Sequence, residues 1–289
     1  MFKERAFHGV LALILTSLLW GSSFPVIKLV VSEVSSYTYT WFRSFLAILI
    51  LLPYVVFVYF KKNLDKKVVE GGLLAGLAYA LGLWLQGWGT SYTTASNSAF
   101  ITGLNVIFVH VYVALTLRKY DFKLALALTL SLTGLYFLTS PVAGVNIGDI
   151  LVLLGAVMWA AQIIIVDKFS KGDPFVFTFF EMIPALSFSI LDFISNKFTC
   201  PPLGVILKLL YLALFCSVFA YALQVYGQRY ISPAIASIIL LMEPVFATIF
   251  AYALLSERLS LLQTLGAGMM ISAMLMSSLS KVSYKQNKV

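Results

Sequence analysis

Apolar windows of about 20 residues follow one another along almost the whole chain, with short polar breaks between them. A helix needs about 20 mainly apolar residues to cross the hydrocarbon core of a bilayer. We place ten such spans, at residues 9–31, 38–60, 71–92, 95–117, 123–140, 148–167, 174–195, 205–228, 233–255 and 260–280. Only 11% of the residues are charged, against roughly a quarter in soluble domains. The sequence therefore predicts an all-α integral membrane protein with ten transmembrane helices, most of which lies in the lipid bilayer.

The basic residues are distributed unevenly over the polar breaks. The chain carries 20 Lys and Arg residues and a net charge of +8, a balance that in a soluble protein would suggest a nucleic-acid partner. If the ten spans alternate in direction, most of these residues fall on the side that holds both termini. Positive charge collects on the cytoplasmic side of membrane proteins. We therefore expect a multi-pass protein of the cell membrane with both termini in the cytoplasm, and no nucleic-acid partner.

A shift of 138 residues superimposes the first half of the chain on the second. The agreement is best in the third and eighth spans, where Leu85, Gln86, Gly89 and Tyr92 meet Leu223, Gln224, Gly227 and Tyr230. A shift of 139 pairs Gly9, Leu15 and Trp20 with Gly148, Leu154 and Trp159. Five helices per half is an odd number, so the second half enters the membrane in the opposite orientation. We predict two inverted five-helix repeats, residues 1–140 and 141–289.

Inverted repeats are the usual architecture of alternating-access transporters, whose substrate site lies near the midplane between the halves. The alternative is a repeat that builds only a scaffold or a pore.

Several short motifs resemble the drug/metabolite transporter superfamily, in its ten-helix form with two EamA-type repeats. The first repeat carries Leu19-Trp20-Gly21-Ser22-Ser23-Phe24 with Lys28, and Arg43-Ser44-Phe45-Leu46-Ala47. The second carries Gly148-Asp149, Trp159-Ala160, Met242-Glu243-Pro244-Val245-Phe246-Ala247, Leu255-Ser256-Glu257-Arg258-Leu259, and Gln263 with Gly266. The order and spacing of these motifs hold over nearly the whole chain. The resemblance implies an inverted-repeat carrier, often an exporter of amino acids, other metabolites or toxic compounds.

The first repeat departs from the family pattern at two places. Asn105-Val106 stands where many relatives have a proline in the fourth helix, and Lys119-Tyr120 stands where a Glu-Arg pair is common. We therefore expect the two halves to behave asymmetrically.

Two polar residues fall near the middle of equivalent spans. Glu243 lies about eleven residues into the ninth span, where an ionisable group costs several kcal/mol and usually faces a partner or a wet cavity. Pro244 beside it leaves the carbonyl of Leu240 without its helical donor. We expect Glu243 to bind substrate and to load and release a proton; a Glu that only fills a polar gap is the alternative. Its repeat mate Asn105 offers a donor and an acceptor to a substrate at the same depth, or else an interhelical hydrogen bond.

Arg43 and Glu181 are also repeat mates, on the second and seventh spans. Symmetry could bring these opposite charges together, or it could place them on opposite sides of the bundle. Because a buried charge most often has a protein partner, we expect structural or gating ion pairs rather than substrate binding. Asp192 and Lys208 lie near the outer ends of their spans, where we expect solvation.

A mixed aromatic and polar stripe recurs in the first and sixth spans. Trp20 and Trp159 occupy equivalent positions, and Ser23 and Gln162 follow three residues later on the same helix faces. Small-molecule cavities combine such side chains; the alternative is tryptophan at the lipid interface. Gln86 and Gln224, each with a glycine three residues on, are expected to line the same cavity or to join helices.

The sequence favours a secondary transporter over other functions. It has no His-rich or Cys-rich metal spacing, nucleophile elbow or phosphate-binding Gly-Lys loop, so we expect no metal, no cofactor and no enzymatic activity. A passive channel and a polytopic membrane enzyme remain the alternatives. The span centres supply one carboxylate, amides, hydroxyls and aromatics but almost no Lys or Arg, whereas phosphorylated solutes would need basic clamps. We therefore expect a small zwitterionic, neutral or cationic substrate, with amino acids first and amphipathic toxic compounds second.

Overall fold

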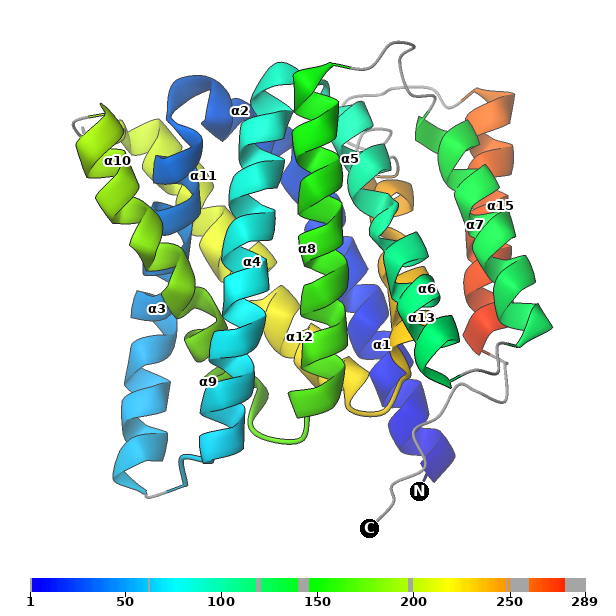
Figure 1. The fold of residues 1–289 in the computed structure, drawn as a ribbon, viewed down its shortest axis with the longest axis horizontal. Helices are drawn as coiled ribbons and strands as arrows, with labels where there is room; N and C mark the ends of the chain where they lie inside the picture. The colour runs from blue at the N-terminus through cyan, green and yellow to red at the C-terminus, as the bar shows by residue number, and fades with distance from the viewer. Residues whose placement is uncertain are drawn as a thin grey trace.

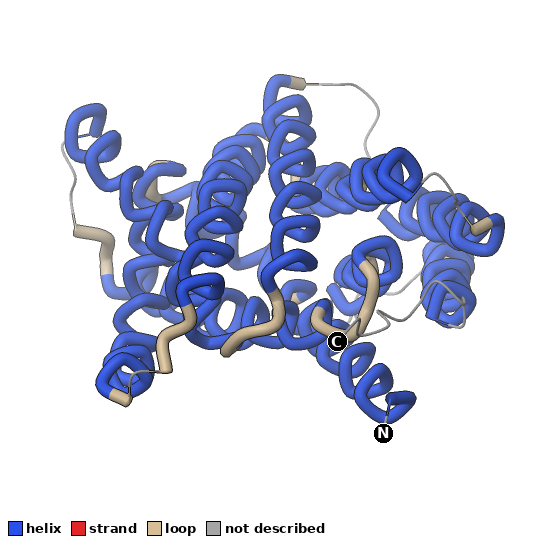
Figure 2. Tube along the Cα trace, turned by 60° about the horizontal axis from the view of Figure 1, so that its bottom comes forward, coloured by secondary structure: helices blue, strands red, loops and turns tan. Residues whose placement is uncertain are grey.

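The protein is a bundle of helices that run up and down past one another (Figure 1). The computed structural model describes residues 2–61, 63–117, 121–139, 146–196, 200–247, 249 and 260–278. No strand occurs within these residues (Figure 2). The departure at Lys119-Tyr120 and the motif at 255–259 lie outside them.

The helices of the first half are α1 (Phe2–Gly21), α2 (Ser23–Glu33), α3 (Ser36–Phe60), α4 (Lys66–Tyr92), α5 (Ala95–Gly103), α6 (Asn105–Leu117) and α7 (Phe122–Thr139). Those of the second half are α8 (Ile147–Phe169), α9 (Pro174–Met182), α10 (Phe188–Asn196), α11 (Leu203–Ala213), α12 (Ala220–Gln228), α13 (Pro233–Leu240) and α15 (Leu261–Ser278). The predicted all-α membrane fold is confirmed. Nine apolar helices within the described residues are long enough to cross a membrane, and a tenth, shorter one covers Pro233–Ala247.

Local sequence explains where several of these helices begin. The Ser35 hydroxyl accepts a hydrogen bond from the Thr38 backbone and caps α3. Asn146 and Asp149 form a reciprocal capping box at the start of α8. Asp173 caps α9. Its first residue, Pro174, has no N–H group, so no backbone donor is left unpaired at that position.

Three of the expected continuous spans are broken near their middle. The first span breaks at Ser22, the fourth at Leu104, and the ninth at Leu241–Met242. The latter two breaks are repeat mates with the same geometry: the amide of Leu104 donates to the carbonyl of Ile101, and that of Met242 to that of Ile239. Each is a tight i→i−3 turn in place of an α-helical bond. Hydropathy did not predict these breaks, because it reports length in lipid and not backbone continuity.

Two other spans change their winding without breaking. The seventh runs from α9 through the 3₁₀ segment η1 (Ile183–Ser187) into α10, where Pro184 removes a backbone donor. The eighth contains a π-helical segment, η2 (Leu214–Phe219), between α11 and α12. Such segments concentrate at functional sites.

Two glycine contacts between the repeats are related by the same internal symmetry as the sequence. A Cβ on Gly89 of α4 would lie 2.6 Å from the carbonyl oxygen of Gly148 on α8. The repeat mates of these residues, Gly227 on α12 and Gly9 on α1, meet in the same way, with a Cβ on Gly227 only 2.9 Å from the Gly9 oxygen. The helix pairs α4/α8 and α1/α12 therefore join the first repeat to the second at two equivalent seams; α4 and α8 run side by side in the centre of Figure 1.

A third pair lies at one end of the bundle. There α7 and α15 pack against each other, with Gly134 and Gly266 in mutual contact (Figure 1). Close approach through glycine is the usual means by which membrane helices associate, because lipid offers no hydrophobic drive between them.

Candidate functional site

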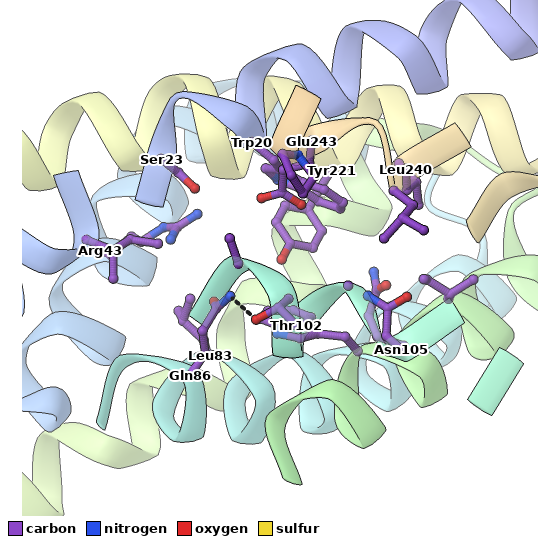
Figure 3. Close-up of a pocket in the computed structure, with 18 residues that line it drawn as sticks. Trp20, Ser23, Arg43, Leu83, Gln86, Thr102, Asn105, Tyr221, Leu240 and Glu243 are labelled. Atoms are coloured by element: carbon purple, nitrogen blue, oxygen red, sulfur yellow. Dashed lines mark hydrogen bonds between the residues drawn. The ribbon is translucent and has the colours of Figure 1, made fainter. Parts of the chain in front are cut away.

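A pocket lies where the broken helices meet (Figure 3). Its lining includes Ser23 after the first break, Asn105 after the second and Glu243 after the third. The breaks are held together by small residues: a Cβ on Gly21 would lie 2.7 Å from the Glu243 carbonyl oxygen, and one on Gly103 would lie 2.7 Å from Leu241 Cδ1. All but one of the residues predicted for the cavity line it: Trp20, Ser23, Gln86, Asn105, Trp159, Gln162 and Glu243. The exception is Gln224.

Glu243 and Asn105 present free polar groups to the pocket from its two symmetry-related walls. Both side chains are partly exposed. Figure 3 shows them on helices that face each other across the space, with Asn105 opposite Leu240. Neither carboxylate nor amide makes a hydrogen bond with another described residue. A ligand in the pocket is therefore offered an acceptor on one side and both a donor and an acceptor on the other.

Arg43 brings a cation to the same pocket, which the sequence did not lead us to expect. Its guanidinium is buried, with Nε donating to the Ser217 hydroxyl at 2.9 Å, Nη1 to the Tyr39 hydroxyl at 2.8 Å and Nη2 to the Cys216 carbonyl at 3.0 Å. Three of the five N–H groups are used. Two of the three partners belong to η2, so the π-helical segment provides the socket for this cation. The remaining donors are available to an anionic group of a ligand.

Aromatic rings form another wall of the pocket. Trp20 and Tyr221 pack edge to face with centroids 5.1 Å apart, and Tyr79 packs edge to face against both Tyr221 and Trp159. Trp20 is fixed by a hydrogen bond from its indole nitrogen to the Cys216 carbonyl. The predicted role of the two tryptophans in a cavity is consistent with this placement. Tyr221 was missed, although its position three residues before Gln224 puts it on the same helix face.

A buried seam of amides lies behind the pocket. Gln162 and Gln224 hydrogen bond to each other in both directions, at 3.1 and 2.9 Å. Gln224 also donates to Gln228, and Gln228 to the Ile163 carbonyl. Gln224 thus supports the pocket through Gln162 instead of lining it. Gln86, its repeat mate, does line the pocket and donates to the Thr102 hydroxyl at 3.0 Å.

The predicted ion pair between Arg43 and Glu181 is not formed. Glu181 is fully buried and accepts a hydrogen bond from Gln162 at 2.6 Å, while the Arg43 guanidinium is occupied by Tyr39, Ser217 and Cys216. Repeat symmetry makes two residues equivalent without making them neighbours. The pair's expected gating role stays a prediction that no contact between the two supports.

Asp192 corrects a further expectation, since it is buried rather than solvated. Its carboxylate accepts hydrogen bonds from Ser35, Thr38 and the Trp41 indole, at 2.9, 2.7 and 2.9 Å, and so ties α10 to the start of α3. Lys208 is paired with Glu33. Within the described residues no three His, Cys, Asp or Glu side chains lie close enough to hold a metal ion.

Comparison with known proteins identifies the family of this chain. Two consecutive matches to the EamA-like transporter family cover residues 7–140 and 146–279. The chain belongs to the EamA-like transporter family. It is 34% identical over 279 residues to a protein of Archaeoglobus fulgidus described as an uncharacterized transporter, with 95% of this chain and 87% of that protein covered.

Two further likenesses extend over most of this EamA chain. It is 26% identical to the uncharacterized inner membrane transporter YedA of Escherichia coli K12, covering 93% of this chain and 90% of YedA. A solved crystal structure matches the fold with a TM-score of 0.76 at 12% identity and covers 94% of this chain and 96% of the other. The protein is therefore a multi-pass membrane transporter, as the sequence predicted.

Proposed function

We propose that this EamA transporter is a secondary carrier that exports small zwitterionic metabolites, amino acids foremost, in exchange for protons by alternating access. Glu243 acts as the coupling carboxylate and both termini lie in the cytoplasm of the cell membrane. The observation that carries the proposal is the presence of Arg43 and Glu243 on one aromatic-lined pocket. A solute with one carboxylate and one ammonium group finds an opposite charge for each.

The charge balance argues against the other substrate classes. A phosphorylated solute carries at least one more negative charge than a single guanidinium neutralises, and the described lining of the pocket holds no second Lys or Arg. A purely cationic solute could pair with Glu243 but would place its charge near Arg43. A zwitterion leaves neither protein charge unpaired, which is the costly state in a low-dielectric site.

The same geometry supports coupling by exchange. Glu243 makes no hydrogen bond with a described side chain, so a proton and a substrate ammonium group would compete for the same carboxylate. A carrier that binds one or the other, but not both, moves them in opposite directions. With a proton gradient directed into the cell, that exchange drives the solute out.

The test is transport by the purified protein in proteoliposomes. We expect labelled amino acids to exchange across the bilayer in counterflow, and an imposed pH gradient to drive their accumulation on the acidic side. Simple amines without a carboxylate should exchange more slowly. If no solute of either class exchanges, the carrier proposal fails.

The matched variants are Glu243→Gln and Glu70→Gln. Glu70 lies on α4 with about half its side chain exposed and pairs only with Lys66, so it reports the effect of losing any carboxylate. Glu243→Gln should abolish gradient-driven accumulation and change the pH dependence of exchange, whereas Glu70→Gln should behave as wild type. If Glu243→Gln keeps the wild-type pH dependence, the coupling assignment is wrong even if transport itself is confirmed.

A further inference from the structure

We propose that Glu181 is a second proton-binding site of the transporter, and that Gln162 links its proton occupancy to the state of the substrate pocket. This inference rests on the proposed function for its role in transport, but the site itself can be tested without a substrate. It begins from the hydrogen bonding of the buried acids.

The three buried carboxylates of the described chain accept very different sets of hydrogen bonds. Asp192 accepts three side-chain hydrogen bonds over both oxygens. Asp149 accepts from the Thr93 hydroxyl on one oxygen and from the Asn146 backbone on the other. Glu181, with no exposed surface, receives one hydrogen bond on Oε1, from Gln162, and its Oε2 is buried with no hydrogen-bond partner among the described residues.

No Lys, Arg or His of the described residues forms an ion pair with Glu181. The hydroxyls of Tyr79 on α4 and Tyr221 on α12 lie in electrostatic range of it. Arg43 on α3 also acts on these two tyrosines, and on Tyr39 and Cys216, but its guanidinium donates to Tyr39 and η2 and forms no ion pair with Glu181. An ionised carboxylate left in apolar surroundings with one neutral donor is strongly disfavoured. Glu181 is therefore a carboxylic acid in this conformation.

Helix α9 packs tightly against α4 at Glu181, which has no exposed surface. A Cβ on Gly76 would lie 2.6 Å from the Glu181 carbonyl oxygen, and one on Gly72 would lie 2.7 Å from that of Phe177, so α9 presses directly on α4. Thr178, one turn earlier on the same face of α9, has a buried hydroxyl that likewise makes no hydrogen bond with a described residue. The acid and this hydroxyl are both buried on one face of α9.

Gln162 connects Glu181 to the substrate pocket. Its side chain lines the pocket and at the same time donates to Glu181 Oε1 and to Gln224 Oε1 with the two hydrogens of its amide. Both donors are thus in use, and a substrate that takes a hydrogen bond from Gln162 must withdraw one of them. If the Glu181 bond is withdrawn, the proton affinity of the acid changes, and by linkage the protonation of Glu181 changes substrate affinity by the same factor.

Infrared spectroscopy of the lipid-reconstituted protein tests the site directly. In the Glu243→Gln background, we expect a carboxylic-acid C=O band at neutral pH that disappears in Glu243→Gln/Glu181→Gln. Gln162→Leu should shift that band to higher frequency because the carbonyl loses its 2.6 Å hydrogen bond. Gln228→Leu, which alters the same amide seam without touching Glu181, should leave its frequency unchanged.

Two results would overturn the site. One is an acid band that Glu181→Gln leaves unchanged, which would mean that another carboxylic acid produces it; the other is a band that Gln162→Leu does not move. If Glu181→Gln fails to fold, ¹³C-glutamate labelling of Glu243→Gln and of Glu243→Gln/Gln162→Leu identifies the band instead. These results do not depend on transport, so a failure here is distinguishable from a failure of the carrier proposal.

Transport kinetics test the coupling. Where counterflow of an amino acid is observed, Glu181→Gln should retain exchange but shift its pH profile and lower the number of protons moved per solute. An unchanged profile and proton number would restrict Glu181 to a structural role and overturn the coupling.

Discussion

Equivalent residues of the two repeats are used in opposite ways. In the second repeat, Gln162 hydrogen bonds to both Glu181 and Gln224, and of these three residues only Gln162 lines the pocket. Their mates in the first repeat, Ser23, Arg43 and Gln86, all line the pocket, and no hydrogen bond joins any two of them. The two repeats keep the same backbone arrangement. The polar side chains of the first repeat line the pocket, whereas those of the second are joined by hydrogen bonds through Gln162 in the buried seam. An inverted-repeat protein can thus build one directional site from two copies of one plan.

Removing the cation, Arg43, is expected to have the largest effect on this arrangement of polar groups. Arg43→Gln would leave the Tyr39 and Ser217 hydroxyls without the hydrogen bonds that Arg43 donates, and Glu243 without a nearby positive charge. Leaving a buried polar group without its hydrogen bond costs about 1–3 kcal/mol. We expect loss of counterflow and a clearly lower midpoint of thermal unfolding in detergent.

Lys66→Ala, at a side chain that is 89% exposed, is the control for loss of a basic residue and should leave both unchanged. Wild-type stability in Arg43→Gln would show that the η2 socket contributes little to the fold.

Exchanging the polar mates at the two matching breaks sharpens the comparison. Glu243→Asn alone should reduce gradient-driven transport at least about tenfold, the effect of some 1.4 kcal/mol. The double variant Asn105→Asp/Glu243→Asn moves the carboxylate to the opposite wall of the same pocket and should recover part of the activity. A double variant no better than the single one would show that the two walls are not interchangeable.

Much of this layout was accessible from sequence, and the two shifts of 138 and 139 residues explain why. Hydropathy located ten spans, and the repeat identified Asn105 with Glu243 and Trp20 with Trp159, all of which line the pocket. The contacts of Arg43 and Glu181 were not accessible, because a two-fold relation fixes equivalence but not distance. Nor was the π-helical winding of Leu214–Phe219, which has no proline or glycine to signal it and depends on tertiary packing.

The two glycine seams offer a smaller test. Gly89→Ala would push a Cβ to 2.6 Å from both the Gly148 carbonyl oxygen and Val152 Cγ2, and the backbone contact cannot yield. At the equivalent position, Gly227→Ala first meets the Leu13 side chain, at 2.7 Å, which can rotate, and its backbone contact with the Gly9 oxygen is longer, at 2.9 Å. Overpacking typically costs about 1–3 kcal/mol, so we expect thermal unfolding to show a larger loss for Gly89→Ala. Gly204→Ala, with no neighbour within 4 Å, should be neutral. Equal losses at the two seams would contradict the asymmetry.

The smallest expected difference is in stability, between variants of the two tryptophans. Trp20 donates to the Cys216 carbonyl, whereas the Trp159 indole nitrogen is buried with no hydrogen-bond partner among the described residues. A hydrogen bond contributes about 1 kcal/mol net. Trp20→Phe should therefore be less stable than Trp159→Phe by about that amount, measured by denaturant or thermal unfolding. The reverse order would mean that packing of the rings outweighs the indole bond.

The paired glycine seams also determine how a half-length version of this chain could assemble. Each seam joins a helix of one repeat to a helix of the other, so a chain ending after α7 would expose the glycine faces of both α1 and α4. The surfaces that match those faces occur only on a copy inserted upside down. A half-length version would therefore have to be made in both topologies and assemble as an antiparallel dimer, with charge bias in its loops weak enough to permit either insertion.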